Sequence, residues 1–364
     1  MTLSRYLARR FALAFLLVLA IFFGLMLLID MVELVGRFPE GSVSFGQLVG
    51  LAALKVPKSL YRILPLIATL SAIALFLALA RSSELVVIRA AGRSALRLLV
   101  APVLVALAIG ALSVMVFNPL VAATSKLYDE LVQRYANGTV SVLSLSPEGL
   151  WLRQGGNDQQ MVIRASEANQ DGTSLTHVSF LEFDGTGRPT SRIEAAKADL
   201  VAGAWQLTDA KRWNLTDPNP EATARMLDRV EVASDLTSQR IRDSFGEPSA
   251  IPVWDLPAFI KSLDRAGFSS RQHRVWLQME LALPILMAGM VLLAAGFTMR
   301  HARFGKTGTL VLAAVLAGFA IFFMRNFAQV LGESGQIPIA LAAWSPPVAS
   351  VLLSLGLLLH MEDG

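Results

Sequence analysis

The sequence predicts a membrane protein of six transmembrane α-helices, arranged as three helices, an inserted β-jellyroll-like domain and three more helices. The main observation is a set of six apolar runs. Each has about 20 residues or more, which at about 1.5 Å rise per residue crosses a hydrocarbon core of about 30 Å. In addition, the chain between the third and fourth runs changes to short strand patterns separated by turns. The runs are Phe11–Val35, Leu60–Ala80, Leu96–Leu120, Val275–Met299, Thr309–Leu331 and Ile339–His360.

The composition agrees with a chain that lies largely in lipid. Hydrophobic residues make up 54% of the sequence and charged residues only 16%, which favours a membrane protein over a soluble one. The first apolar run is longer and more uniform than the core of a signal peptide. It also lacks a small-residue cleavage site before Asp30 and Glu33, so we expect it to be retained. The sequence contains no Cys, which excludes disulfides and thiolate metal sites.

Lys and Arg in the short connections predict the orientation, because cytoplasmic loops carry an excess of these residues. The richer side has Arg5, Arg9, Arg10, Arg81, Arg89, Arg93, Arg97, Arg300, Arg303 and Lys306. The short loops of the other side carry Arg37, Lys55, Lys58 and Arg62. We therefore expect an inner-membrane protein of a Gram-negative cell, with both termini in the cytoplasm and the inserted domain in the periplasm. The isoelectric point near 9.6 follows from these flanking charges and does not indicate nucleic-acid binding.

These patterns divide the chain into three segments. Residues 1–120 hold the first three helices, with a short cytoplasmic helix at 82–94 between the second and the third. Residues 121–270 form the β domain and its return linker. Residues 271–364 form the last three helices.

The inserted segment is typical of an antiparallel β domain. Strand-like stretches at about 10-residue spacing suggest a sandwich, a jelly roll or an open barrel. Such a sheet offers an apolar trough to a lipid-like ligand or its edge to another strand, or it serves only as a spacer. Asp255–Gly267 predicts a short amphipathic helix leading back to the membrane. The strands are predicted at Gly149–Arg153, Met161–Ala165, Leu175–Phe183, Ser191–Leu200 and Ala204–Leu215.

The segment Ser82–Ser94, SSELVVIRAAGRS, predicts a short amphipathic helix at the cytoplasmic face. Ser82 or Ser83 can cap it, and the helix dipole favours Glu84 in the first turn. The other residues form an apolar stripe of Leu85, Ile88 and Ala91, a basic stripe of Arg89, Arg93 and Arg97, and a break at Gly92. Two explanations fit: a helix held in the groove of an ATPase subunit, or a basic loop resting on anionic headgroups.

Four segments resemble the lipopolysaccharide-export permeases of the LptF/LptG family. They are Ser4–Phe11 (SRYLARRF), Val56–Lys58 (VPK), Arg81–Gly92 (RSSELVVIRAAG) and Gly149–Trp151 (GLW). The resemblance covers essentially the whole chain, including its length and its layout of three helices, domain and three helices. The ELVV…AAG block is the specific part and, with GLW, favours the LptG branch over LptF.

The resemblance implies a transport subunit that works with a homologous permease, LptF, and two copies of a cytoplasmic ATPase, LptB. Such a complex takes lipopolysaccharide from the outer leaflet of the inner membrane and passes it to a periplasmic bridge of β-jellyroll proteins, LptC and LptA. It also implies that Ser82–Ser94 is the helix coupled to the ATPase. The coupling residues are then Glu84, Leu85, Ile88, Arg89, Ala91 and Gly92.

Charges at membrane depth suggest a lateral gate, since each is costly there. Asp30 and Glu33 lie near the outer end of the first run, and Arg325 lies in the outer part of the fifth. The resemblance implies that these two helices line the gates between the permeases. A pair of the Asp30–Arg325 type, within the chain or across the gate, would hold the cavity closed. The alternative is that all three side chains reach the interface by snorkelling.

Four cations at the predicted outer rim are candidates for binding the phosphates and carboxylates of lipopolysaccharide. They are Arg37, Lys58, Arg62 and Arg134, and Lys58 and Arg134 match basic positions of the family best. The alternative is that each of these side chains only anchors its helix at the membrane surface. At position 30 relatives can carry a lysine, whereas this chain has Asp30. This departure from the family argues against a substrate-binding cation at that position.

No catalytic residue, metal site or cofactor is predicted. Gly305–Thr307 reads GKT, but a phosphate-binding loop needs a glycine where Arg300 stands. We found neither metal-ligand spacing of His nor a nucleophile constellation, so the energy source would be a partner subunit. The predicted function is therefore a permease subunit of an ATP-driven lipopolysaccharide exporter. The alternative functions are those of the sister permease LptF, of another ABC-type lipid or lipoprotein extractor, or of a non-transporting scaffold for envelope assembly.

Overall fold

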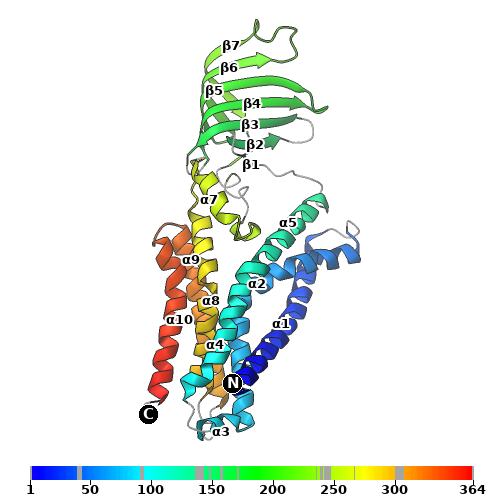
Figure 1. Ribbon diagram of the computed structural model, residues 1–364. Coiled ribbons are helices and arrows are strands. Elements are labelled where there is room, and N and C mark those ends of the chain that lie inside the picture. The colour runs from blue at the N-terminus through cyan, green and yellow to red at the C-terminus, as the bar shows by residue number, and fades with distance from the viewer. Residues whose placement is uncertain are drawn as a thin grey trace. The chain divides into compact units, whose positions relative to one another are not determined.

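The structure is a computed structural model that describes residues 2–38, 43–90, 94–135, 143–146, 149–155, 159–169, 172–234, 236–237, 241, 247–265, 267–299 and 307–362. The chain forms two compact units (Figure 1). The helical unit contains Met1–Val132, Ser249–Trp254 and Arg271–Gly364. The sheet unit contains Gln133–Pro248 and Asp255–Ser270.

The helical unit confirms the prediction of six apolar helices. The described residues contain six helical spans that are long and apolar enough to cross a membrane, Leu3–Arg37, Phe45–Arg81, Leu96–Val132, Arg271–Thr298, Gly308–Glu333 and Ile339–His360. The third span is composite, because a π-helical turn at Ser113–Phe117 joins two α-helices. The helices are α1 (Thr2–Arg37), α2 (Phe45–Arg81), the short α3 (Glu84–Ala90), α4 (Ala95–Leu112), α5 (Asn118–Tyr135), α8 (Arg271–Thr298), α9 (Thr307–Glu333) and α10 (Ile339–Glu362).

Helix α2 is longer than its apolar run predicts, and this corrects the placement of three cations. Ser44 and Gln47 form a capping box, in which each side chain hydrogen-bonds the backbone N–H of the other, so the helix begins at Phe45. Lys55, Lys58 and Arg62 therefore lie inside a helix and not in a short loop. Their spacing is helical, which brings them to neighbouring positions on α2.

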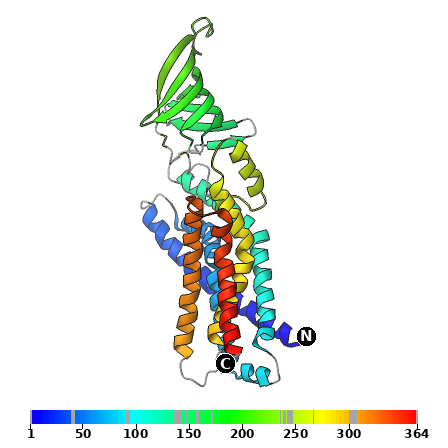
Figure 2. The ribbon, with the colours of Figure 1, turned by 90° about the vertical axis from the view of Figure 1, so that its left-hand side faces the viewer.

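Helix α8 is the centre of the bundle. It packs against α2, α4, α9 and α10 (Figures 1 and 2). Most of its side chains are buried. Helices associate in lipid through close packing, because lipid supplies little hydrophobic driving force between them. Gly110 of α4 gives such a contact, since a Cβ there would lie 2.5 Å from the Cα of Pro284 in α8. Helix α1, in contrast, packs mainly on α2 and α4, and few residues of its apolar span are fully buried.

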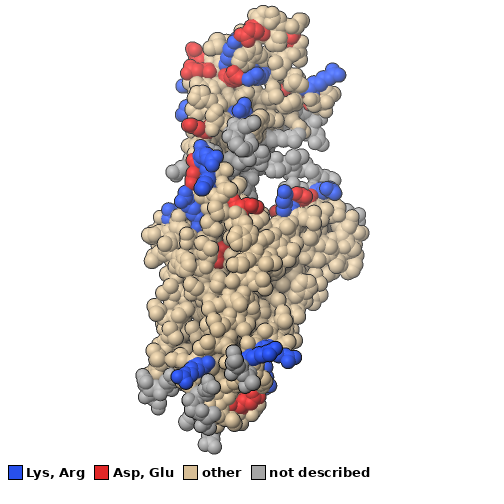
Figure 3. All heavy atoms as spheres, in the orientation of Figure 1, with Lys and Arg blue, Asp and Glu red and all other residues tan. Residues whose placement is uncertain are grey.

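The surface of the helical unit carries a wide uncharged band over the spans, as Figure 3 shows. Lys and Arg gather at the end where α3 lies. The start of α1 and the end of α10 lie at this same end, which we call the α3 end (Figures 1 and 2). The opposite end, called the far end, carries the end of α1, the start of α2 and the turn at 334–338 between α9 and α10. The chain continues from this far end into the sheet unit through α5.

The sheet unit contains one antiparallel sheet of seven strands in the order β1 to β7, which confirms the predicted β domain. Each described strand pairs with the next one along the chain, as in a meander. Five of the strands match the predicted ones. The sequence patterns missed β1, which has only four residues, and β7, which is charged and exposed. The strands are β1 (Leu143–Ser146), β2 (Gly149–Gly155), β3 (Gln159–Ala168), β4 (Ser174–Asp184), β5 (Pro189–Val201), β6 (Ala204–Asn214) and β7 (Arg225–Ala233).

One face of the sheet forms the core of this unit. Phe180 of β4 and Trp205 of β6 are fully buried there, with their ring centroids 6.3 Å apart. Helix α7 (Leu256–Arg265) covers part of this face through Leu263, and Leu256 and Ile260 continue its buried stripe. The predicted amphipathic return helix is therefore present, and it covers part of the apolar face of the sheet.

We predict that Gly110→Val destabilises the helical unit. The added side chain collides with backbone of α8 and not with a flexible side chain, and overpacking of this kind costs about 1–3 kcal/mol. The measurement is the fraction of full-length chain that stays monodisperse in mild detergent after heating. Gly356→Val is the matched control, because nothing lies within 4 Å of a Cβ at that position. Equal losses in the two variants would contradict the close contact.

Candidate functional site

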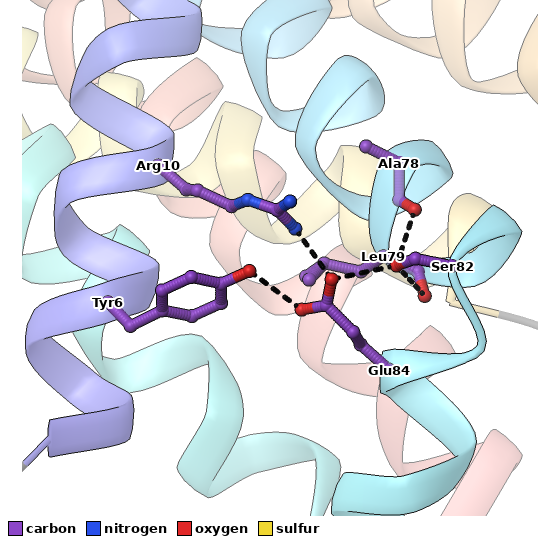
Figure 4. Close-up of polar contacts among 6 residues, drawn as sticks. All are labelled: Tyr6, Arg10, Ala78, Leu79, Ser82 and Glu84. Carbon is purple, nitrogen blue, oxygen red and sulfur yellow. Dashed lines mark hydrogen bonds and ion pairs between the residues drawn. The ribbon is translucent and has the colours of Figure 1, made fainter.

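Glu84, at the start of α3, ties this short helix to α1. Arg10 Nη1 lies 3.1 Å from Glu84 Oε1, and the Tyr6 hydroxyl donates to Oε2 at 2.9 Å (Figure 4). The hydroxyl of Ser82 donates to Oε1 at 2.9 Å. One carboxylate therefore joins the first turns of α1 to the connection between α2 and α3.

The backbone around Ser83 explains how α3 turns away from α2. Ser83 has a φ of 58°, a left-handed conformation that ends a helix and that non-glycine residues seldom adopt. Its carbonyl then accepts the N–H groups of Val86 and Val87 at 3.1 and 3.3 Å, so α3 starts at once. A helix of seven residues is too short to be stable alone. Its position depends on packing and on Glu84.

The two described members of the predicted apolar stripe of α3, Leu85 and Ile88, lie on the same, inward side of the helix. Leu85 is buried in the core of the helical unit, and Ile88 packs against that core. Val86 and Val87 are 53% and 67% exposed, so they are the apolar side chains of α3 that a partner would meet. The predicted coupling residues Ala91 and Gly92 lie outside the described residues, and so does the side chain of Arg89.

The surroundings of Glu84 keep it charged. Burial alone would raise the pKa of its carboxyl, but the hydrogen bonds from Ser82 and Tyr6 and the charge of Arg10 outweigh this effect and hold the pKa below its usual range. A depressed pKa means that the contact stabilises the folded state above the ordinary glutamate value and is lost only as the pH falls through the lower folded value. At neutral pH the tie between α1 and α3 is therefore intact.

At the far end, Lys55 of α2 holds two acids of α1. Its Nζ lies 3.2 Å from Asp30 Oδ1 and 2.7 Å from Glu33 Oε2. Ser59, one turn along α2, donates its hydroxyl to Asp30 Oδ2 at 3.4 Å. The Asp30 side chain is only 6% exposed, whereas that of Glu33 is 57% exposed, so Asp30 depends most on this partner.

A cavity of about 210 Å³ lies beside this ion cluster. Two of the predicted substrate cations, Lys58 and Arg62, line it. The other two are exposed at helix ends, Arg37 as the last residue of α1 and Arg134 near the end of α5 in the sheet unit. The complete lining is Lys55, Lys58, Ser59, Arg62, Ser125, Tyr128 and Asp129.

Arg325 of α9 belongs to a buried polar cluster in the middle of the bundle. Its main electrostatic partner is Glu280 of α8, which has no exposed surface. The hydroxyl of Tyr61 in α2 donates to Glu280 Oε2, and Asn118 of α5 lies beside both groups. Asn118 also accepts the backbone N–H of Val253 at 2.8 Å. The cluster joins four helices and the return segment of the helical unit.

These partners bear on the predicted lateral gate. Asp30 forms an ion pair with Lys55, and Glu280 is the acid whose charge acts most strongly on Arg325. Within this chain Asp30 and Arg325 therefore lie near different opposite charges, which corrects an Asp30–Arg325 pair inside one molecule. The physical reason is that each side chain meets an opposite charge on a helix against which its own helix packs, α2 for α1 and α8 for α9.

Sequence reasoning missed Glu280, Tyr61, Asn118 and the role of Lys55. Glu280 lies inside the fourth apolar run, and an acid at that depth is itself a sign of a functional or structural partner. Lys55 contributed only to the predicted orientation, because the sequence pattern placed the start of α2 several residues after this lysine. No group of three or more potential metal ligands is found among the described residues.

The layout of six spans and a separate antiparallel sheet matches a known family along nearly the whole chain. The family model described as "Lipopolysaccharide export system permease LptF/LptG" matches residues 5–360. The chain belongs to the LptF/LptG family. It is therefore a multi-pass membrane protein of a family of export permeases, and this family is not itself one of enzymes.

Two curated relatives span the same length. The lipopolysaccharide export system permease protein LptG of Escherichia coli K12 is 24% identical over 339 residues, 93% of this chain and 91% of the relative. The protein of the same name from Haemophilus influenzae is 23% identical over 373 residues, 100% of this chain and 99% of the relative. The similarity thus includes both the helical unit and the sheet unit.

We predict that Glu84→Gln loosens α3 from the helical unit. Loss of a charged acceptor costs about 1–3 kcal/mol, so α3 should detach more often and a cysteine placed at the buried Leu85 should react several-fold faster with a water-soluble maleimide. The chain has no native Cys, which makes this label specific. Arg81→Gln, at the exposed end of α2, is the control. An unchanged labelling rate in Glu84→Gln would show that the contacts of Glu84 do not hold α3.

We also predict that Glu280→Gln and Arg325→Gln are each strongly destabilising but not additive. Removing one partner of a buried charge pair costs about 3–5 kcal/mol, because the other is left uncompensated. The double variant should therefore lose clearly less than the sum of the two single losses. The measurement is the free energy of unfolding in a denaturing-detergent titration. Strict additivity would mean that Glu280 and Arg325 are not coupled.

Proposed function

We propose that this chain is the LptG-type permease subunit of an ABC-type lipopolysaccharide exporter of the inner membrane. Membership of the LptF/LptG family over residues 5–360 is the observation that carries the proposal. Two relatives named LptG and the ELVV…AAG segment favour this branch over LptF. The chain would contribute half of a cavity shared with the homologous permease LptF. Lipopolysaccharide would then pass to a periplasmic bridge formed by LptC and LptA.

The energy would come from two copies of the ATPase LptB, and α3 is the proposed point of contact. Val86 and Val87 offer exposed apolar side chains at the α3 end, and Glu84, Leu85 and Ile88 hold the helix to the bundle. Arg89, Ala91 and Gly92 would complete the coupling helix. Movement of the ATPases would reach α1 through the contact of Glu84 with Tyr6 and Arg10. In this arrangement the termini are cytoplasmic and the sheet unit is periplasmic.

The substrate would be held by cations at the far end. Lys58 and Arg62 line one cavity, and Arg37 and Arg134 are exposed on helices α1 and α5. Phosphate and carboxylate groups form strong charge-assisted hydrogen bonds with such side chains. Asp30, Glu33 and Arg325 would control a lateral gate lined by α1 and α9, through which the lipid enters.

The test is affinity purification of the full chain from its native membrane in mild detergent, followed by an ATPase assay. We expect the wild type to bring down an ATPase and a second six-span permease. Val87→Glu should lose most of the ATPase, because a charge replaces an exposed apolar contact, while the second permease stays. Val201→Glu, at an exposed apolar position of β5 in the sheet unit, is the control for the added charge. Recovery of the chain without any ATPase, under conditions that preserve a known ABC complex, would refute the proposal and favour a scaffold.

A further inference from the structure

Prolines interrupt three of the spans that form the buried polar cluster of the helical unit. This cluster, called the Glu280 cluster, consists of Tyr61, Asn118, Glu280 and Arg325. Pro65 of α2 and Pro284 of α8 stand four positions after the tyrosine and the glutamate, and Pro119 directly follows the asparagine. A proline has no N–H for the carbonyl four positions earlier, so it removes a helical hydrogen bond and bends the helix. The hydrogen-bond ladder of each span is therefore broken next to the cluster.

A fourth span, α10, has its prolines at the same level of the bundle. Pro346–Pro347 lies inside this helix. On one side of the two prolines, the indole N–H of Trp344 donates to Gln278 of α8 at 2.9 Å. On the other side, the hydroxyl of Ser354 donates to the carbonyl of Gly289 in α8 at 3.4 Å. The prolines of α10 therefore lie opposite the stretch of α8 between these two contacts, which contains the glutamate of the cluster and the proline that follows it.

Two buried hydroxyls favour bends at this level. Thr69 of α2 donates to the carbonyl of Pro65 at 3.0 Å, and Ser350 of α10 donates to the carbonyl of Pro347 at 2.7 Å. A hydroxyl that bonds back to the preceding turn competes with the backbone N–H for that carbonyl and often bends a helix. The four spans therefore share a weak point at one level of the bundle.

The polar cluster can follow a bend at this level, because one oxygen of Glu280 has no hydrogen bond. Oε2 accepts the hydroxyl of Tyr61, whereas Oε1 is buried without a hydrogen-bond partner in the described part of the chain. The positive charge of Arg325 lies near the carboxylate, and a guanidinium has five N–H donors. The carboxylate therefore keeps a donor when the helices shift, which avoids the cost of leaving a buried charge uncompensated.

We propose that the helical unit bends at the level of the Glu280 cluster, so that the half of the bundle nearer α3 moves against the half nearer the far end. The prolines provide the weak points in α2, the third span, α8 and α10, and the cluster keeps the helices in register while they bend. The other two spans, α1 and α9, contain no proline, so the bend changes their tilt and not their shape. Such a hinge lets two packed halves move without repacking either of them.

The inference goes beyond the proposed function, because the bend requires neither an ATPase nor a lipid. It also states where a displacement applied at the α3 end would be taken up. The displacement would become a change of angle in the middle of the bundle, and it would reach the far end as a movement of all the helices of that half together.

The test measures the movement of the two halves in the full chain in phosphatidylcholine nanodiscs. Spin labels are attached to pairs of introduced cysteines at exposed leucines, and the absence of native Cys makes the labels specific. Leu104 and Leu359 lie on the α3 side of the prolines, and Leu127 and Leu341 lie on the far side. Pulsed electron resonance then gives the distance distribution of each pair.

We expect the pairs that cross the level of the prolines to have wider distributions than the pairs within one half. Leu104–Leu341 and Leu127–Leu359 cross this level, and their distributions should be wider by about 2 Å or more. Leu104–Leu359 and Leu127–Leu341 lie within one half and are the reference. Equal widths in crossing and reference pairs would overturn the bend.

Proline substitutions test the cause of the bend. Pro65→Ala/Pro284→Ala restores two backbone N–H donors and should narrow the crossing distributions to the width of the reference pairs. Pro102→Ala is the matched control, because Pro102 is a buried proline inside α4. It lies 16 residues before Asn118, about 24 Å along the helix, and its substitution should change nothing. An unchanged width in the double variant, or the same narrowing in Pro102→Ala, would overturn the role of the prolines at this level.

A second variant tests the cluster without changing the backbone. Tyr61→Phe removes the hydrogen bond to Glu280 and should widen the crossing distributions further, by about 1 Å or more, because the halves are then held less firmly. Unchanged crossing distributions in Tyr61→Phe would show that the cluster does not limit the bend. The chain is measured without an ATPase and without lipopolysaccharide, so failure of the bend leaves the proposed export function standing. Failure to recover an ATPase in the purification leaves the bend standing.

Discussion

The buried carboxylate of Glu280 is the constraint on which the helical unit depends. A charge at this depth is tolerated only if it is hydrogen-bonded and compensated. The Tyr61 hydroxyl hydrogen-bonds one of its oxygens, and Asn118 and the positive charge of Arg325 lie near it, from three other helices. Because all four side chains must meet at one point, α2, α5, α8 and α9 have a fixed register relative to one another. Apolar packing alone leaves such a register loosely specified, since lipid competes equally for apolar surface.

The π-helical turn before Asn118 is part of this arrangement. An extra residue in the turn rotates the following helix relative to the preceding one, which places Asn118 in the cluster. The turn also leaves the Met115 carbonyl to accept the indole N–H of Trp254 at 3.3 Å. The return segment is thereby attached at the same level, through Val253 and Trp254. A local irregularity in the third span thus serves two purposes, burial of a polar side chain and attachment of the chain that comes back from the sheet unit.

The sequence predicted the architecture well and the polar contacts poorly, for identifiable physical reasons. Six apolar runs and period-two strands are local signals, so the helices and strands β2 to β6 follow from them. Partners are not local: Glu280 and Tyr61 are 219 positions apart, and Glu84 and Tyr6 are 78 positions apart. Sequence reasoning selected Asp30 and Arg325 correctly as unusual charges, but only the packing of α1 on α2 and of α9 on α8 determines their partners. Lys55 was misplaced because the capping box at Ser44 extends α2 beyond its apolar part.

Ion pairs and hydrogen bonds attach both ends of α1 to neighbouring helices. Arg10 and Tyr6 hold Glu84 at the α3 end, and Asp30 and Glu33 hold Lys55 at the far end. Arg10 and Asp30 are 20 residues apart in one uninterrupted helix, which at about 1.5 Å per residue is roughly 30 Å, the thickness of the hydrocarbon core. This spacing places the two polar contacts at the two membrane interfaces, where charged groups can still reach water. Between them α1 packs on α2 and α4 through apolar side chains that include the buried Phe11 and Phe15. The position of α1 therefore depends on this apolar packing as well as on the polar contacts at its ends, whereas the helices that meet at Glu280 share a polar cluster in the middle of the bundle.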